Sequence, residues 1–202
     1  IKKIIVDSTD KSTSIINEEI LRKFDYVIKR EKNNCISKEK YLATMLPCSL
    51  VNYKISKNKE NIRWNKIGRS KPNNEFRYDI FFSGKKTSDH RKELIEFIKN
   101  QNLNFYGGVE NMKIPYNQYL ETIYESAINL AFEGKGEFTF RHLEILACCS
   151  FMICEKSINQ LDLPIPLKEG KHFVSFDNKE DLLEKINFYL KNKNLRSDIA
   201  LN

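Results

Sequence analysis

Apolar and polar positions follow one regular rhythm over the second half of the chain. From Tyr78 onward, short apolar runs alternate with longer segments in which apolar residues recur every three or four positions. Buried strands produce the first pattern and amphipathic helices the second. The predicted strands are 78–83, 103–106, 127–132, 151–154 and 172–176, and the predicted helices are 89–100, 115–126, 139–149 and 179–192.

Strands that alternate with helices of this length favour right-handed βαβ units. The pattern therefore predicts an α/β fold, a Rossmann-like parallel sheet flanked by helices. Ligands of such sheets bind beyond the carboxyl ends of the strands. The loops that follow each strand are the places where we expect functional residues.

The first half of the chain is less regular. Strands are predicted at 2–7 and 26–28 and a helix at 17–24, whereas 33–50 is ambiguous and 52–74 has the polar composition of a linker. The chain begins with Ile and opens directly on a strand-like run. We therefore expect residues 1–74 to be the remnant of an N-terminal domain with its linker, and 75–202 to be a separate Rossmann-like domain.

Composition narrows the class of protein. The chain carries 34 basic and 27 acidic residues, a net charge of +7, and the Lys residues are scattered. Scattered charge is typical of a solvated surface, and a basic groove for a phosphorylated ligand is the alternative. No stretch approaches the ~18 apolar residues of a membrane span, and no signal peptide is visible.

The five cysteines form no metal or disulfide pattern. Their number is odd and no C-x-x-C pair occurs, which favours buried free thiols in a reducing compartment and hence a cytoplasmic protein. A zinc site that combines His142 with these cysteines lacks ligand spacing, so no metal site is predicted. The cysteines are Cys35, Cys48, Cys148, Cys149 and Cys154.

The loop after the strand at 78–83 is the first candidate for anion binding. It holds Gly84, Lys85 and Lys86 and leads into a helix that carries Arg91. Free N–H groups and the helix dipole favour a phosphate at such a helix start. The Walker spacing is absent, and an ordinary βα turn with solvated lysines is the alternative.

The loop after the strand at 127–132 is the stronger candidate. Gly134 and Gly136 allow the backbone to approach a ligand, and Thr139 can cap the next helix. The N–H groups of Thr139, Phe140 and Arg141 then face the ligand, the Arg141 side chain can pair with a diphosphate, and the Glu144 carboxylate can accept both hydroxyls of a ribose. The alternative for Arg141 and Glu144 is a weak i, i+3 surface pair. His142 could face the site or only pack and hydrogen-bond, and packing is favoured because no carboxylate pairs with it to make a base.

The run from Arg141 to Phe151 resembles the C-terminal domain of GT-B glycosyltransferases, and is most similar to the group-1 and CgeB-like subset. In that family a Gly-containing loop leads into an Arg-x-x-Glu helix, an Ala-Cys-Gly-like corner and a short strand. The segments 119–130 and 171–190, and Phe82-Ser83-Gly84 followed by Arg91, are similar as well. Cys149 stands where the corner usually has Gly, and Glu133 and Glu144 lie farther apart than the paired glutamates of many members.

The resemblance implies a metal-independent hexosyltransferase without a cofactor. Its substrates would be a UDP- or GDP-linked sugar and a hydroxyl acceptor on a glycan, protein or lipid, in glycan or cell-surface polysaccharide biosynthesis. Glu144 would bind the ribose, the segment from Gly134 through Lys135 to Arg141 would hold the diphosphate, and 107–110 would lie near the base. The residues 84–86 and Arg91 would be on the phosphate side.

No residue is predicted to be catalytic. Asp7 and Asp10 follow a strand and could border the active site, although capping of a strand end is the simpler function for them.

Two other classes of protein compete with a glycosyltransferase. One is a non-catalytic basic module for nucleic acid or anionic glycan. The aromatic residues do not interleave with Lys and Arg as on RNA-binding surfaces, which argues against nucleic acid. The other is a sugar-phosphate epimerase or a kinase, and both lack their glycine motifs here. Convergence of Glu144, Arg141 and Lys85 on one site would favour the glycosyltransferase.

Overall fold

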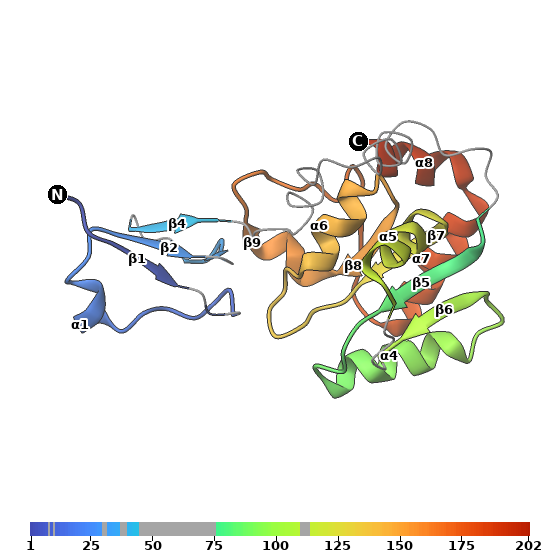
Figure 1. Ribbon diagram of the computed structural model, residues 1–202, viewed down its shortest axis with the longest axis horizontal. Coiled ribbons are helices and arrows are strands. Elements are labelled where there is room, and N and C mark those ends of the chain that lie inside the picture. The colour runs from blue at the N-terminus through green and yellow to red at the C-terminus, as the bar shows by residue number, and fades with distance from the viewer. Residues whose placement is uncertain (8, 10, 30–31, 37–39, 45–75, 110–113) are drawn as a thin grey trace.

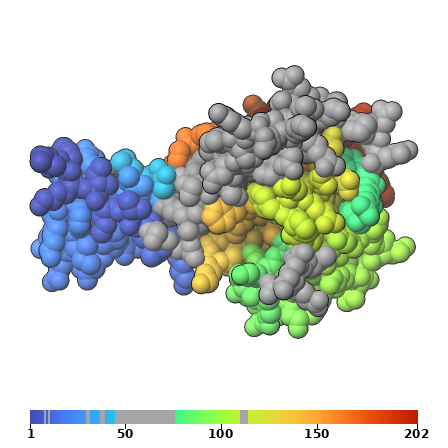
Figure 2. Space-filling model, in the orientation of Figure 1, coloured from blue at the N-terminus to red at the C-terminus, as the bar shows by residue number. Residues whose placement is uncertain are grey.

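A computed structural model describes residues 1–7, 9, 11–29, 32–36, 40–44, 76–109 and 114–202. The predicted linker at 52–74, together with Asp10, Cys48 and Glu110, lies outside these residues. The described chain forms a small N-terminal part and a larger α/β part (Figure 1). In the space-filling view the N-terminal residues, in blue, form a separate mass beside the larger part (Figure 2).

The larger part contains a five-stranded sheet in which every pairing is parallel, with the order β10-β8-β7-β5-β6. The predicted α/β class and the parallel Rossmann-like sheet are confirmed. Its strands are β5 (Tyr78–Ser83), β6 (Phe105–Gly108), β7 (Ser126–Ala131), β8 (Met152–Glu155) and β10 (Val174–Phe176).

Helices cover both faces of this sheet because its strands are apolar on both sides. In β5, Ile80 and Phe82 point into one core layer and Phe81 into the other, and all residues of the central strand β7 are buried. A parallel sheet with two covered faces needs such strands. One layer includes residues of α4 (Asp89–Lys99), α7 (Lys179–Lys191) and α8 (Lys193–Leu201), and the other includes residues of α5 (Tyr116–Tyr124) and α6 (Phe140–Ala147).

The strand order reverses between β5 and β7. From β5 the chain goes to β6 on one side of it, and then crosses back to β7 on the other side. The connections therefore diverge at the carboxyl ends of β5 and β7, which is where open α/β sheets bind ligands. The two candidate loops of the sequence follow these two strands.

The elements of the larger part that differ from the prediction include β6 and the last two helices. The glycines that were expected to close the strand at 103–106 lie inside β6. Gly107 has φ +114°, and a Cβ there would lie 1.8 Å from the Phe82 carbonyl oxygen, so only glycine allows β6 to approach β5. The predicted helix 179–192 ends at Lys191, and an unpredicted helix, α8, follows after Asn192.

The N-terminal part is a three-stranded parallel sheet with the order β1-β2-β4. The predicted helix at 17–24 is reduced to one turn, and Leu21 is the residue of this segment that packs on the small core. The elements are β1 (Ile4–Asp7), α1 (Glu18–Leu21), β2 (Tyr26–Lys29) and β4 (Tyr41–Ala43).

Asp7 has a structural role at the end of β1. Its carboxylate accepts hydrogen bonds from Thr9 and forms a buried ion pair with Lys29 at 3.0 Å. Burial opposes ionisation of Asp7, but these contacts outweigh it and hold its pKa below the usual value. These contacts agree with the predicted capping of the strand end by Asp7.

Several contacts within the described residues join the N-terminal part to the larger one. The short strand β3 (Lys32–Asn33) pairs antiparallel with β9 (Leu161–Asp162), which follows the 3-10 helix η1 (Lys156–Gln160). In addition, the Ser12 hydroxyl donates to the Glu137 carboxylate at 2.7 Å. Glu137 belongs to the loop after β7, so the N-terminal part contacts one of the candidate loops directly.

Candidate functional site

The loop after β5 joins the start of α4 to the centre of the sheet. Gly84 N–H donates to the Gly108 carbonyl at 3.1 Å, and the Ser88 hydroxyl caps α4 by accepting from Arg91 N–H at 3.2 Å. The Lys85 and Lys86 side chains are exposed, and Lys86 pairs with Asp89 at 2.7 Å on the surface. The two lysines predicted for phosphate binding thus extend into solvent.

Arg91 is buried between the two candidate loops. Its Nη1 donates to the Lys85 carbonyl at 2.9 Å, and its Nη2 donates to the carbonyls of Phe132, at 2.9 Å, and Glu133. Only 5% of the residue is exposed, and its buried Nε has no hydrogen-bond partner among the described residues. Arg91 therefore ties the loop after β5 to the loop after β7.

The loop after β7 is a tight turn that ends in a capped helix. Gly134 N–H donates to the Gly136 carbonyl at 2.9 Å, and α6 begins after Thr139. His142, three residues after this cap, accepts from Thr139 N–H through Nδ1 at 3.0 Å. Lys135 is exposed, as is nearly half of Phe140.

His142 is part of the helix cap and does not face solvent. It is 1% exposed and stacks on Phe138 with 5.0 Å between ring centroids. Burial, with a smaller effect from Arg141 and Arg91, lowers its pKa to about 3. The imidazole is therefore neutral at physiological pH, in agreement with the packing alternative.

Arg141 lies at the carboxyl end of β5. Its guanidinium carbon is 4.2 Å from the centroid of the Phe82 ring. A Cβ placed on Gly84 would lie 3.0 Å from Arg141 Nη2, so the absence of a side chain at Gly84 leaves room for this guanidinium. Arg141 Nε donates to the Tyr119 hydroxyl at 3.4 Å, and no acidic residue of the described chain forms an ion pair with it.

Glu144 is a buried carboxylate, 9% exposed, on the same helix. Its two oxygens accept hydrogen bonds from Tyr116, at 3.1 Å, and Tyr119, at 2.9 Å. No ion pair joins it to Arg141 within the described part of the chain, and Tyr119 hydrogen-bonds to both residues. The alternative of an exposed Arg141–Glu144 pair is therefore wrong.

The arrangement brings two positive charges close together, although the charges of Glu155 and Glu133 partly offset that of Arg91. Burial lowers the pKa of Arg91 to about 10, and the nearby charge of Arg141 adds to this effect. Both guanidinium groups lie near the Phe82 ring, with Arg91 at 5.6 Å and Arg141 at 4.2 Å. Two adjacent cations without a bound carboxylate favour an anion between the two loops.

Glu155 belongs to this edge of the sheet, although the sequence analysis did not select it. It ends β8, accepts from Glu133 N–H, and contacts His90 Nε2 at 2.9 Å. Burial raises its pKa, and the Glu133 charge acts in the same direction. The only signal in the sequence was an acid at the end of an apolar strand, which is also typical of an ordinary turn.

The structure thus brings together part of the predicted set. Gly84, Arg91, Gly134, Arg141 and Glu144 meet where β5 and β7 end. Arg141 and Glu144 are linked through the Tyr119 hydroxyl, whereas Lys85 contributes only its carbonyl, to Arg91, so the three side chains do not converge as predicted. The side chains of Lys85, Lys86, Lys135 and Phe140 are exposed, and in the described structure they form no hydrogen bond or ion pair with this group.

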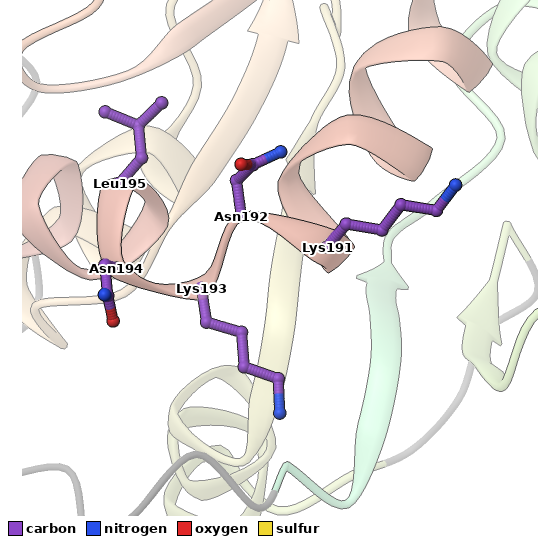
Figure 3. A pocket seen from close by; sticks show the side chains of 5 residues that line it. All are labelled: Lys191, Asn192, Lys193, Asn194 and Leu195. Carbon is purple, nitrogen blue, oxygen red and sulfur yellow. The ribbon is translucent and has the colours of Figure 1, made fainter.

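A shallow hollow at the turn between α7 and α8 is lined by five consecutive residues, 191–195 (Figure 3). The side chains of Lys191 and Lys193 diverge there, so no set of functional groups converges. This turn lies at the C-terminal end of α7, away from the carboxyl edge of the sheet where Arg91 and Arg141 lie. Among the described residues no cluster of His, Cys, Asp and Glu could hold a metal ion. No helix there is long and apolar enough to cross a membrane.

Comparison with known protein families gives one match. A family model described as "Glycosyl transferase-like" matches residues 88–202, which run from the N-cap of α4 to the end of α8. None of the curated proteins matches the chain significantly. The matched segment includes Arg91, the loop after β7, Arg141 and Glu144.

Proposed function

The chain belongs to the glycosyl transferase-like family, and from this we propose that its larger part binds a nucleotide-sugar donor at the edge where β5 and β7 end. The protein then transfers the sugar, a hexose, to a hydroxyl group of a glycan, protein or lipid. The proposal includes a GT-B arrangement of the CgeB-like kind, with the N-terminal part on the acceptor side. It also includes a UDP- or GDP-linked donor, chemistry without a metal ion, and a role in glycan synthesis in the cytoplasm.

One observation carries this proposal. Arg141 is held on the Phe82 ring beside Gly84, has no acidic partner in the described chain, and is linked through Tyr119 to the buried Glu144. A guanidinium binds the diphosphate, and a carboxylate accepts from the ribose hydroxyls. A cation and an acid one helical turn apart therefore match the two polar groups of a nucleoside diphosphate.

The N-termini of two helices and the Arg91 side chain favour binding of the diphosphate at the same edge. The N-termini of α4 and α6 both face the carboxyl edge of the sheet, where free N–H groups and the helix dipoles favour an anion. Arg91 fixes the separation of the two loops through its contacts with the carbonyls of Lys85, Phe132 and Glu133. It also adds positive charge to the site.

The proposed reaction depends on stabilisation of the leaving group. The acceptor oxygen forms a bond to the anomeric carbon, and the bond from that carbon to the diphosphate oxygen breaks, with its electron pair. The charge that develops on the diphosphate meets Arg141, Arg91 and the helix N-termini, which are in place before the reaction. The acceptor hydroxyl proton passes to a base, and no residue is assigned to this role.

A thermal-shift titration with UDP, GDP, ADP and CDP tests the proposal. A ligand that binds only the native state raises the free energy of unfolding by about 2.7 kcal/mol at a concentration a hundredfold above Kd. We expect one nucleoside diphosphate to raise the melting temperature of the wild type and of Lys86→Ala, the matched control, because Lys86 pairs with Asp89 on the surface. Arg141→Gln and Glu144→Gln should lose the shift.

The outcome that contradicts the proposal is a folded wild type that none of the four nucleotides stabilises. An equal shift in all variants would also contradict it, because the ligand would then bind elsewhere. Stabilisation by RNA or heparin alone, steeply weakened by salt, would favour a basic binding module.

A further inference from the structure

Two tyrosines of α5 hold the polar groups of the site in place. The Tyr116 hydroxyl donates to one oxygen of Glu144 and the Tyr119 hydroxyl donates to the other, at 3.1 and 2.9 Å. Tyr119 also accepts from Arg141 Nε at 3.4 Å. The sequence analysis assigned no functional role to either tyrosine.

The geometry points to Tyr116 and Tyr119 as positioning residues of the donor site, which orient Glu144 for the ribose while Tyr119 alone also orients Arg141 for the diphosphate. This inference rests on the proposed function and deepens it. The two tyrosine hydroxyls that hold Glu144 are called the clamp below, and the inference assigns the selectivity for a ribonucleotide to them.

The hydrogen-bond capacity of Glu144 fits this role. An ionised carboxylate offers about four lone-pair positions, two on each oxygen. The tyrosines take one position on each oxygen, so one remains on each for the two neighbouring hydroxyls of a ribose. A direct ion pair with Arg141 would instead occupy the carboxylate and the guanidinium together and leave neither free for a ligand.

The clamp also explains how the Glu144 carboxylate can be buried without an ion-pair partner among the described residues. Burial of an ionised group is costly unless hydrogen bonds compensate for the lost water. The two hydroxyls provide this compensation. Burial and the Glu144 charge raise the pKa of Tyr119 despite the opposing charge of Arg141, so its hydroxyl keeps its proton and remains a donor.

The core fixes the positions of both hydroxyls. The Tyr119 ring packs on the buried Phe81, with 5.7 Å between centroids, and the Tyr116 ring stacks on Tyr119 at 6.0 Å. Rings held by packing place their polar atoms more accurately than a flexible side chain does. The orientation of Glu144 is therefore set by the sheet and α5 before a ligand arrives.

Removal of single hydroxyls tests the inference. The variants are Tyr116→Phe and Tyr119→Phe, and the control is Tyr106→Phe. The Tyr106 ring also stacks on Phe81, but its hydroxyl forms no hydrogen bond in the described structure. Isothermal calorimetry measures Kd for three probes. These are the nucleoside diphosphate that stabilises the wild type, its 2′-deoxy counterpart, and inorganic pyrophosphate.

The two variants should differ in a defined way. We expect Tyr116→Phe to weaken the ribonucleotide about 10-fold, the effect of one hydrogen bond to a charged group, and to leave pyrophosphate unchanged. Tyr119→Phe should weaken both probes, because it contacts Arg141 as well. The preference for ribose over deoxyribose should fall in both variants, and in a Glu144→Gln background neither change should reduce it further.

Wild-type preference for ribose in both variants, with intact folding, would overturn the clamp while leaving the proposed function in place. Equal losses for all three probes would also overturn it, because a general loss of structure does not distinguish ribose from deoxyribose. A wild type that binds no nucleoside diphosphate would overturn the clamp and the proposed function together.

Discussion

The space above Gly84 provides a direct test of the proposed anion site. A Cβ at this position would lie 3.0 Å from Arg141 Nη2, 3.2 Å from Nη1 and 3.2 Å from Phe82 Cζ. Ordinary contacts of a methyl group are about 3.5–4.0 Å, so Gly84→Ala must push the guanidinium aside by a few tenths of an ångström or more. Phe82 is fully buried and cannot give way, so Arg141 moves.

The expected effect is a loss of binding with at most a moderate loss of stability. Gly84 does not have a positive φ, so alanine fits the backbone, and the close contact with the buried Phe82 ring should lower the free energy of unfolding by no more than about 1–3 kcal/mol. A displaced Arg141 loses a hydrogen bond between charged groups, worth about 1.5–3 kcal/mol, which corresponds to a roughly 10- to 150-fold higher Kd for the nucleoside diphosphate.

Calorimetric titration gives Kd, and thermal unfolding gives the stability of the same samples. Lys86→Ala is the matched control, since it removes a charge from the same loop without contact to Arg141, and we expect its Kd to change less than threefold, as is usual for exposed charges. In an Arg141→Gln background, Gly84→Ala should have no further effect. Wild-type affinity in Gly84→Ala would refute the reasoning, because the guanidinium would then not be needed at its present position.

Three further predictions concern stability. His142 has a pKa of about 3 in the native protein and about 6.5 when unfolded, so the unfolded state takes up a proton that the native state does not as the pH falls below 6.5. This proton uptake should lower the free energy of unfolding by about 2 kcal/mol between pH 6.5 and pH 5. The variant His142→Gln keeps an acceptor for Thr139 N–H. Its free energy of unfolding, measured with urea, should depend less steeply on pH, by the equivalent of up to one proton. Gly107→Ala should destabilise the fold by more than about 3 kcal/mol or prevent folding, because its Cβ would lie 1.8 Å from the Phe82 carbonyl oxygen; a soluble variant with the wild-type melting temperature would contradict the β5–β6 contact. Cys149 has φ +47°, where a side chain costs about 1–2 kcal/mol, so Cys149→Gly should raise the melting temperature, and a lower one would show that packing of the thiol outweighs the strain.

Most of the larger part was predictable from the sequence. The apolar runs of β5, β7 and β8 and the periodic faces of α4, α6 and α7 are local patterns, and their alternation requires a parallel sheet. The N-terminal part was less predictable. Its short elements are stabilised by a few contacts between distant residues, such as the pairing of β3 with β9, and these leave no periodic pattern.

The sequence by itself determined the fold class and the two loops that could bind an anion, because the positions of strands and helix starts follow from hydrophobic periodicity and from glycine, Arg and capping residues. Only the tertiary structure decided which charged groups form the site. Arg91 and Arg141 lie 50 positions apart in the chain yet meet near the Phe82 ring, whereas the neighbouring Lys85 and Lys86 extend into solvent. The clamp of Glu144 by Tyr116 and Tyr119 needs α5 and α6 side by side, and this packing depends on contacts that no local pattern encodes.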